Sequence, residues 1–174
     1  MKRYKGMMAG LAAMSALLAG CGIQAAQASQ YLHVEPGTSN VYLKVVSGFS
    51  DNLAENTIDG VPAGDLTVTI PKGSVVHMHV VNNGPQPETF GVYDRNVQLA
   101  FNGSGDPWYS SVDLSAVDGL LTGQSQNYTF TASRVGSYTI ADLLNGATNS
   151  NIPVSNIWET LKVVPSGRPS LTTK

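Results

Sequence analysis

Eight short runs of β-branched and aromatic residues constrain the fold of this chain more than any other feature. Such residues pack well on a pleated surface, and turn residues such as Pro71-Lys72-Gly73 and Asn82-Asn83-Gly84-Pro85 separate the runs. No segment keeps a helical period over three turns, although residues 112–122 could form a turn or two of helix. The predicted strands are Tyr31–Val34, Val41–Val46, Leu66–Ile70, Val75–Val81, Thr89–Tyr93, Gln126–Thr131, Gly136–Ala141 and Ile157–Val164. The pattern indicates an all-β, single-domain β-sandwich.

Two of these runs show which face of each strand is buried. Apolar residues alternate with threonines along Leu66–Ile70, and with His77 and His79 along Val75–Val81. Successive side chains of a strand point to opposite faces, so both runs read as strands with one apolar face and one polar face. This alternation is typical of a two-layer fold.

The N-terminus has the organisation of a secretory signal. The basic residues Lys2, Arg3 and Lys5 precede an apolar stretch from Met7 to Leu18, which is too short to span a membrane. Small residues then lead to Cys21, the only cysteine of the chain. The sequence therefore predicts an exported protein that forms no internal disulfide.

The run Leu17-Leu18-Ala19-Gly20-Cys21 resembles a bacterial lipobox. The resemblance implies that residues 1–20 are a signal peptide and that the sulfur of Cys21 carries lipid. It places the mature protein at the cell surface or on the periplasmic face, anchored to the membrane. An ordinary signal peptide with an incidental cysteine is the alternative.

The remaining chain divides into three parts. Residues 21–30 hold the lipidated cysteine and a small, polar tether, residues 31–165 form the domain, and residues 166–174 read as a flexible tail. Cleavage would leave about 154 residues with a net charge of about −5, which suits one domain with a real core. An acidic chain argues against a nucleic-acid partner and offers anionic lipid no polybasic patch. Membrane attachment would therefore rest on the acyl chains.

The order of several segments resembles the cupredoxins, most closely the sulfocyanin-like branch, over about residues 40–164. The matching segments are Leu66–Gly73, Val76–Gly84, Pro87–Phe90, Gly123–Ser125 before Tyr128–Phe130, Gly136–Tyr138 and Ile157–Val164. The resemblance implies a Greek-key β-sandwich and, in this family, electron transfer through a type 1 copper. The aromatic residues of these segments lie at predicted strand positions, which places them in the core: Tyr128, Phe130, Tyr138 and Trp158.

The copper ligands of the family are missing from this chain. A type 1 site needs two imidazoles and a thiolate, with a weak axial ligand that is usually methionine. The resemblance places Glu88 at the first histidine, Ala141 at the cysteine, Ala147 at the second histidine and Ile157 at the methionine. Residues 142–156 contain no His, Cys or Met. We therefore expect no type 1 site and no cofactor, with copper bound in another way as the alternative.

His77 and His79 form the clearest remaining pattern of possible metal ligands. Two histidines at i and i+2 of a strand project to one face, where their nitrogens could bind Cu(II), Ni(II) or Zn(II). His33 could approach them. The other interpretation is that both are solvated side chains on an exposed sheet face.

The acidic residues give weaker indications of a metal site. Glu88 could bind a hard cation, or it is a paired or solvated turn residue. The acidic residues Asp51, Glu55, Asp59 and Asp65 do not match a calcium loop and read as a solvated acidic surface.

The remaining residues do not decide between an enzyme, a binding module and a copper protein. Phe101, Trp108 and Tyr109 form either a binding face or core under a long loop. No Gly-x-Ser-x-Gly motif occurs, and no nucleophile has an evident base, so we expect no enzyme activity. The prediction is a binding or accessory module of the cell envelope with a possible envelope protein partner. The alternative is a copper-binding protein that captures metal through surface histidines or transfers electrons.

Overall fold

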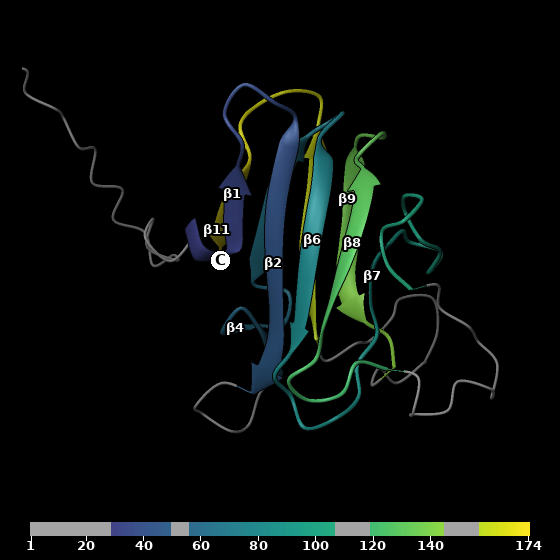
Figure 1. Cartoon of the computed structure of the whole chain (residues 1–174). Helices are drawn as coiled ribbons and strands as arrows, with labels where there is room; N and C mark the ends of the chain where they lie inside the picture. Colours follow the sequence, from purple (N-terminus) through teal and green to yellow (C-terminus); the bar gives the residue numbers. More distant parts are fainter. Residues whose placement is uncertain (1–28, 50–55, 107–118, 145–156) are drawn as a thin grey trace, which may run out of the picture.

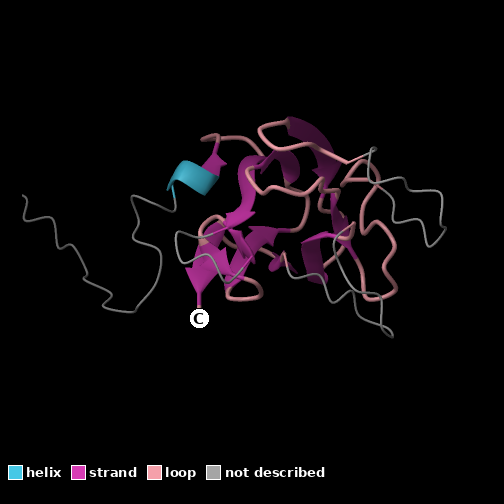
Figure 2. Cartoon of the chain, turned by 90° about the horizontal axis from the view of Figure 1, so that it is seen from below, coloured by secondary structure: helices cyan, strands magenta, loops and turns pink. Residues whose placement is uncertain are grey.

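The computed structural model describes residues 29–49, 56–106, 119–144 and 157–174. These residues form two facing β-sheets, with one short helical turn at residues 29–31 (Figures 1 and 2). The predicted all-β sandwich is confirmed, and each of the eight predicted strands is present. No helix within these ranges is long and apolar enough to cross a membrane.

The first sheet, sheet A, forms the near layer of Figure 1. Its strands run in the order β4-β3-β2-β6-β8, and β1 pairs with β2 as well. The central pair β2–β6 is parallel, and the other pairs are antiparallel. The strands of sheet A are β1 (Leu32–Val34), β2 (Asn40–Phe49), β3 (Asn56–Ile58), β4 (Val61–Pro62), β6 (Val75–Asn82) and β8 (Ser125–Thr131).

The second sheet, sheet B, lies behind sheet A and has the order β11-β5-β10-β9-β7. Strands β5 and β10 pair in parallel, and β10 lies between β5 and β9. The strands of sheet B are β5 (Leu66–Pro71), β7 (Phe90–Tyr93), β9 (Gly136–Asp142), β10 (Trp158–Val164) and β11 (Ser170–Thr173).

The core fills the space between the two sheets. Along β5 and β6 every second residue is buried, as the sequence alternation predicts. Of the two roles open for Phe101, the structure selects the core: its ring stacks on Phe130 at 5.4 Å and meets the edge of Tyr138 at 4.8 Å. Trp108 and Tyr109 lie outside the described residues. Residues 119–122 contain no helix, and the rest of the segment 112–122 is outside the described ranges too.

The hairpin of β3 and β4 is absent from the strands predicted from the sequence. The two strands are joined by Asp59 and Gly60, whose φ angles of 54° and 75° are both left-handed, as a type I′ turn requires. Asp-Gly is a strong signal for this turn, but the flanking strands are too short to show a period.

The prediction of a flexible tail at residues 166–174 is wrong for its second half. Residues 170–173 form β11, which pairs with β5 in the register Leu171 to Val68. The edge of β5 offers backbone groups that need hydrogen-bond partners, and β11 supplies them. Residues 1–28, with Cys21 and most of the predicted tether, lie outside the described part of the chain.

Candidate functional site

The family's ligand positions come together at one end of the sandwich, with Asp142 between them. Asp142 follows Ala141 on β9, and its backbone N–H donates to the carbonyl of Ile157 at 3.1 Å. The charge of Asp142 also acts on Glu88. Glu88 and Ile157 therefore both lie close to Asp142, whereas the side chain of Ala141 packs in a separate cluster with Tyr93 and Leu143, and Ala147 lies outside the described residues.

Glu88 is buried, with 2% of its surface exposed. Its Oε2 accepts a hydrogen bond from the hydroxyl of Ser47 on β2. Burial raises the pKa of Glu88 to about 7; the Ser47 hydrogen bond opposes this rise, and the charge of Asp142 adds to it. Of the interpretations open for Glu88, a solvated turn residue is wrong and a paired one is observed. Its carboxyl group is enclosed because the Pro-rich turn before β7 folds back over the end of β2.

Asp142 has its own backbone partners. Its Oδ1 accepts hydrogen bonds from the N–H groups of Thr89 and Leu144, each at 2.9 Å. These contacts join the turn before β7 to the end of β9. Glu88 and Ser47 are therefore joined by a hydrogen bond, and Asp142 is linked to them through the backbone of Thr89, near the position that the resemblance assigns to the first copper ligand.

These residues do not fit a type 1 copper. Ala141 and Ile157 have no donor atom in their side chains, and the only thiol of the chain is Cys21, in the predicted lipobox. Among the residues that the structure describes, no group of three His, Cys, Asp or Glu side chains is arranged to hold a metal ion.

The second candidate is the outward face of sheet A. One row of side chains runs across it in register, with His33 on β1, Tyr42 on β2 and His77 on β6. The rings of Tyr42 and His77 stack at 4.8 Å with an interplanar angle of 18°, and His33 lies 6.0 Å from Tyr42 at 41°. All three histidines of the chain therefore lie on one sheet face.

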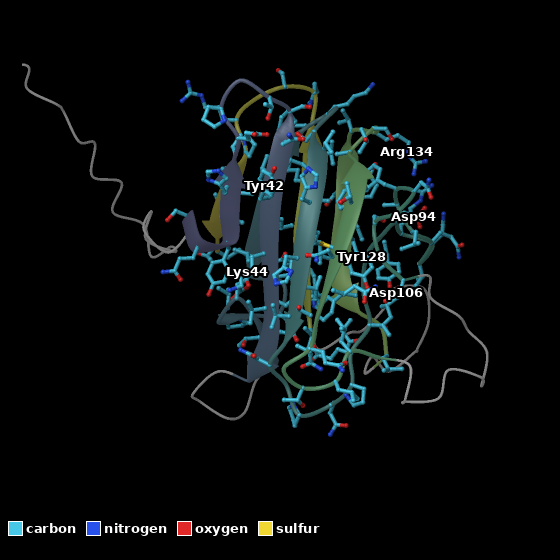
Figure 3. The ribbon with its side chains drawn as sticks, in the orientation of Figure 1. Tyr42, Lys44, Asp94, Asp106, Tyr128 and Arg134 are labelled. Carbon is cyan, nitrogen blue, oxygen red and sulfur yellow. The ribbon has the colours of Figure 1, made fainter. Side chains whose placement is uncertain are left out.

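A second row lies one pleat away on the same face. Lys44 on β2 neighbours His79 on β6, which neighbours Asn127 on β8 (Figure 3 labels Tyr42 and Lys44). His79 Nδ1 lies 2.7 Å from Asn127 Oδ1, which indicates that this nitrogen donates its hydrogen. His79 is half-buried.

His77 has polar contacts on both ring nitrogens. Its Nε2 lies 3.4 Å from Asn40 Oδ1, and its Nδ1 lies 3.4 Å from Thr129 Oγ1. His77 is half-buried like His79. Both lie on the outward face of sheet A, where Tyr42 stacks on the ring of His77 and residues of β8 contact both histidines.

Together these side chains line a hollow of about 340 Å³, which we name the histidine face. Two carboxylates interact with residues of this lining. Glu35 is half-buried, and hydrogen bonds from Asn40 and Thr38 lower its pKa, with smaller effects from His77 and His33. Asp59 lies within reach of the charge of Lys44. The hollow is lined by Gln30, Tyr31, His33, Tyr42, Leu43, Lys44, His77, Met78, His79, Asn127, Tyr128 and Thr129.

The geometry limits how the histidines could share a metal. The ring of Tyr42 lies between His33 and His77, so these two imidazoles are held on opposite sides of a phenol ring. His33 therefore approaches His77, as considered from the sequence, but not as a second ligand of one ion. Within the described face, only the pair His77 and His79 remains as a chelating arrangement.

A buried acid pair lies between the sheets on the other side of β2. Asp59 is 6% exposed, and its Oδ1 accepts the N–H of Val46 at 2.8 Å. Glu159 on β10 is fully buried, and among the described residues neither of its oxygens, nor Oδ2 of Asp59, has a hydrogen-bond partner. Burial raises the pKa of Asp59 to about 7, and burial together with the Asp59 charge raises the pKa of Glu159. The prediction that Asp59 belongs to a solvated surface is wrong, because the Asp59-Gly60 turn folds against β2.

Comparison with known proteins finds solved structures with a similar fold. No protein family and no curated protein matches the chain. Among solved structures, a multicopper oxidase from Pediococcus acidilactici matches with a TM-score of 0.51 and 13% identity, over 76% of this chain and 27% of the oxidase. The multicopper oxidase mgLAC matches with a TM-score of 0.50 and 19% identity, over 72% of this chain and 39% of its own.

These likenesses establish the cupredoxin-like β-sandwich predicted from the sequence. At such low identity they show the fold alone. The chain spans between a quarter and two fifths of the length of these oxidases.

Proposed function

We propose that this chain is an exported, lipid-anchored, cupredoxin-like module of the cell envelope that lacks the type 1 copper and binds its partner or ligand at the histidine face. The proposal takes export and anchoring from the signal sequence and Cys21. It takes the binding role from the face of sheet A, where polar and aromatic side chains line a hollow on a rigid scaffold.

One observation carries the loss of copper. Glu88 stands at the position of the first histidine ligand, where it is buried and bonded to Ser47, while Ala141 stands in place of the thiolate. The Glu88 carboxyl group is therefore occupied by a partner within the protein, and Ala141 offers no donor atom for a metal. The two oxidases that share the fold are matched over only 27% and 39% of their own length, so the likeness carries no activity over to this chain. The proposal is therefore a binding role without catalysis.

A second candidate is Cu(II) capture. It is favoured by the gathering of all three histidines on one face, with His77 and His79 on the same side of β6. Sulfocyanin-like electron transfer is weaker, because it requires a thiolate ligand.

Copper loading tests these alternatives. The chain carrying Cys21→Ser is purified, loaded with Cu(II) and desalted, then analysed for metal content and visible absorbance. Folded, colourless protein without retained copper is the expected result. One retained copper that is lost in His77→Ala/His79→Ala would favour capture, and an intense blue band would refute the proposal.

A further inference from the structure

We propose that the hollow of the histidine face binds a small planar anion of the aromatic carboxylate class. The proposal rests on the binding role given above and assigns the ligand chemistry of that site.

The lining of the hollow carries one positive charge and no negative charge. Among the described residues, it includes Lys44 and all three histidines, but no Asp or Glu. The phenol hydroxyl of Tyr31 adds a further donor. Lys44 supplies one cation and the imidazole rings supply N–H donors, and a lining of this kind without a carboxylate is complementary to an anion.

The rings of His33, Tyr42 and His77 form a row that suits an aromatic ligand. Side chains stand roughly perpendicular to a sheet, so rings stacked side by side along a row present their edges to solvent. Ring edges carry partial positive charge, and the face of an aromatic ring is partially negative. A flat aromatic ligand lying over the row would therefore meet it edge to face. Tyr42, at the centre of the row, is 41% exposed and accessible to such a ligand.

Lys44 is placed to bind the carboxylate of a ligand that lies over this row. Lys44 lies two residues along β2 from Tyr42, on the same face, and Figure 3 shows both on the near side of sheet A. Residues i and i+2 of a strand are about 7 Å apart. An ammonium group that hydrogen-bonds a benzoate oxygen lies about 6–7 Å from the ring centre, which is a comparable distance. The ring would lie over Tyr42 and the carboxylate beside Lys44.

The two carboxylates that interact with the lining do not block this arrangement. Glu35 is half-buried, and its Oε2 accepts a hydrogen bond from Asn40 at 2.6 Å, away from the second row. Asp59 is directed into the protein, with Oδ1 bonded to the backbone of β2. The volume of about 340 Å³ lies at the small end of the range for ligand pockets, which favours a single-ring ligand.

The test uses benzoate with two matched ligands and the full chain carrying Cys21→Ser. Benzamide keeps the ring without the charge, and cyclohexanecarboxylate keeps the charge without the aromatic face. Each is titrated to about 20 mM while amide shifts of β2 and β6 are followed by NMR. We expect saturable shifts with benzoate and at least about fivefold weaker binding of the other two.

Variants locate the site. Lys44→Gln and Tyr42→Leu should each weaken benzoate binding about fivefold or more, while Tyr42→Phe should retain it. Lys72→Gln is the control, because Lys72 is exposed in the turn before β6 and outside the hollow. Equal binding of the three ligands, an equal effect of Lys72→Gln, or no saturable shift with folded protein would overturn the inference. The copper experiment separates this failure from failure of the proposed function, since colourless protein without benzoate binding refutes only the ligand class.

Discussion

Asp59→Asn is expected to stabilise the protein above neutral pH and to change its stability little at pH 4. Asp59 is the first residue of a two-residue type I′ turn, where Asn is equally favoured. An Asn side chain keeps an oxygen to accept the N–H of Val46, at 2.8 Å in the wild type. It also places an N–H donor where Oδ2 now has no partner among the described residues, within reach of the Glu159 charge.

The magnitude follows from the pKa of Asp59, which burial raises from 3.8 to about 7. A carboxyl group with a raised pKa in the folded state contributes full stability below its unfolded pKa of 3.8. That stability is lost as the pH rises to the folded-state pKa of about 7. Above this pH the group is ionised in both states, so its contribution no longer changes. About three pKa units correspond to about 4 kcal/mol, which is an upper bound for one group. We therefore expect a gain of about 2–4 kcal/mol for Asp59→Asn at pH 8.

Urea unfolding at pH 4, 6 and 8, followed by circular dichroism, measures this change. Asp65→Asn is the matched control, because Asp65 lies in the same loop region but is half-exposed. The variant should show a flatter dependence of the free energy of unfolding on pH than the wild type. A variant that is less stable than the wild type at pH 8, or that keeps the same slope between pH 4 and 7, would refute the assignment of a buried, destabilising carboxyl group.

Three further changes test other features. Glu88→Gln should keep the Ser47 hydrogen bond and reduce the loss of stability between pH 4.5 and about 7. The free energy of unfolding should rise by about 1–3 kcal/mol over the wild type at pH 8. A steeper pH dependence in urea unfolding would contradict this. Gly64→Ala should cost about 2–4 kcal/mol, because φ is +82° and the new Cβ would lie 2.3 Å from Trp158, whereas Gly73→Ala, with φ +92° and open space, should cost about 1 kcal/mol. Equal shifts in Tm for the two would count against the close packing of Gly64 on the Trp158 ring. Deletion of residues 166–174 removes β11 and should cost roughly 1–3 kcal/mol; an unchanged Tm would restore the interpretation of a flexible tail.

The strands of the sandwich could be predicted because their signals are local. Alternation along β6 is a property of neighbouring residues, so it also placed His77 and His79 on the outward face correctly. The hairpin of β3 and β4 was missed because strands of two or three residues carry no period. β11 was missed because an edge strand with one exposed face reads as polar.

The site was less accessible to sequence reasoning. Which side chains lie beside His77 depends on the register of β6 with β2 and of β2 with β1, which is set by tertiary pairing. The sequence therefore gives no sign that Tyr42 lies between two histidines. Asp59 was expected in water because carboxylates are rarely buried without a partner. The burial of Glu159 has one local signal, since the alternation of β10 places it in line with Ile157 and Leu161.

The position of β10 has a consequence for how the chain folds. It is the central strand of sheet B, and its parallel pairing with β5 joins Thr160 to Thr67 across most of the domain. Contacts between residues so far apart in sequence close long loops, and such topologies fold slowly. Until the last strands are present, β5 and β9 have no common partner. An exported chain of this design would remain unfolded through most of its passage across a membrane, and its compaction would be completed by the final segments to arrive.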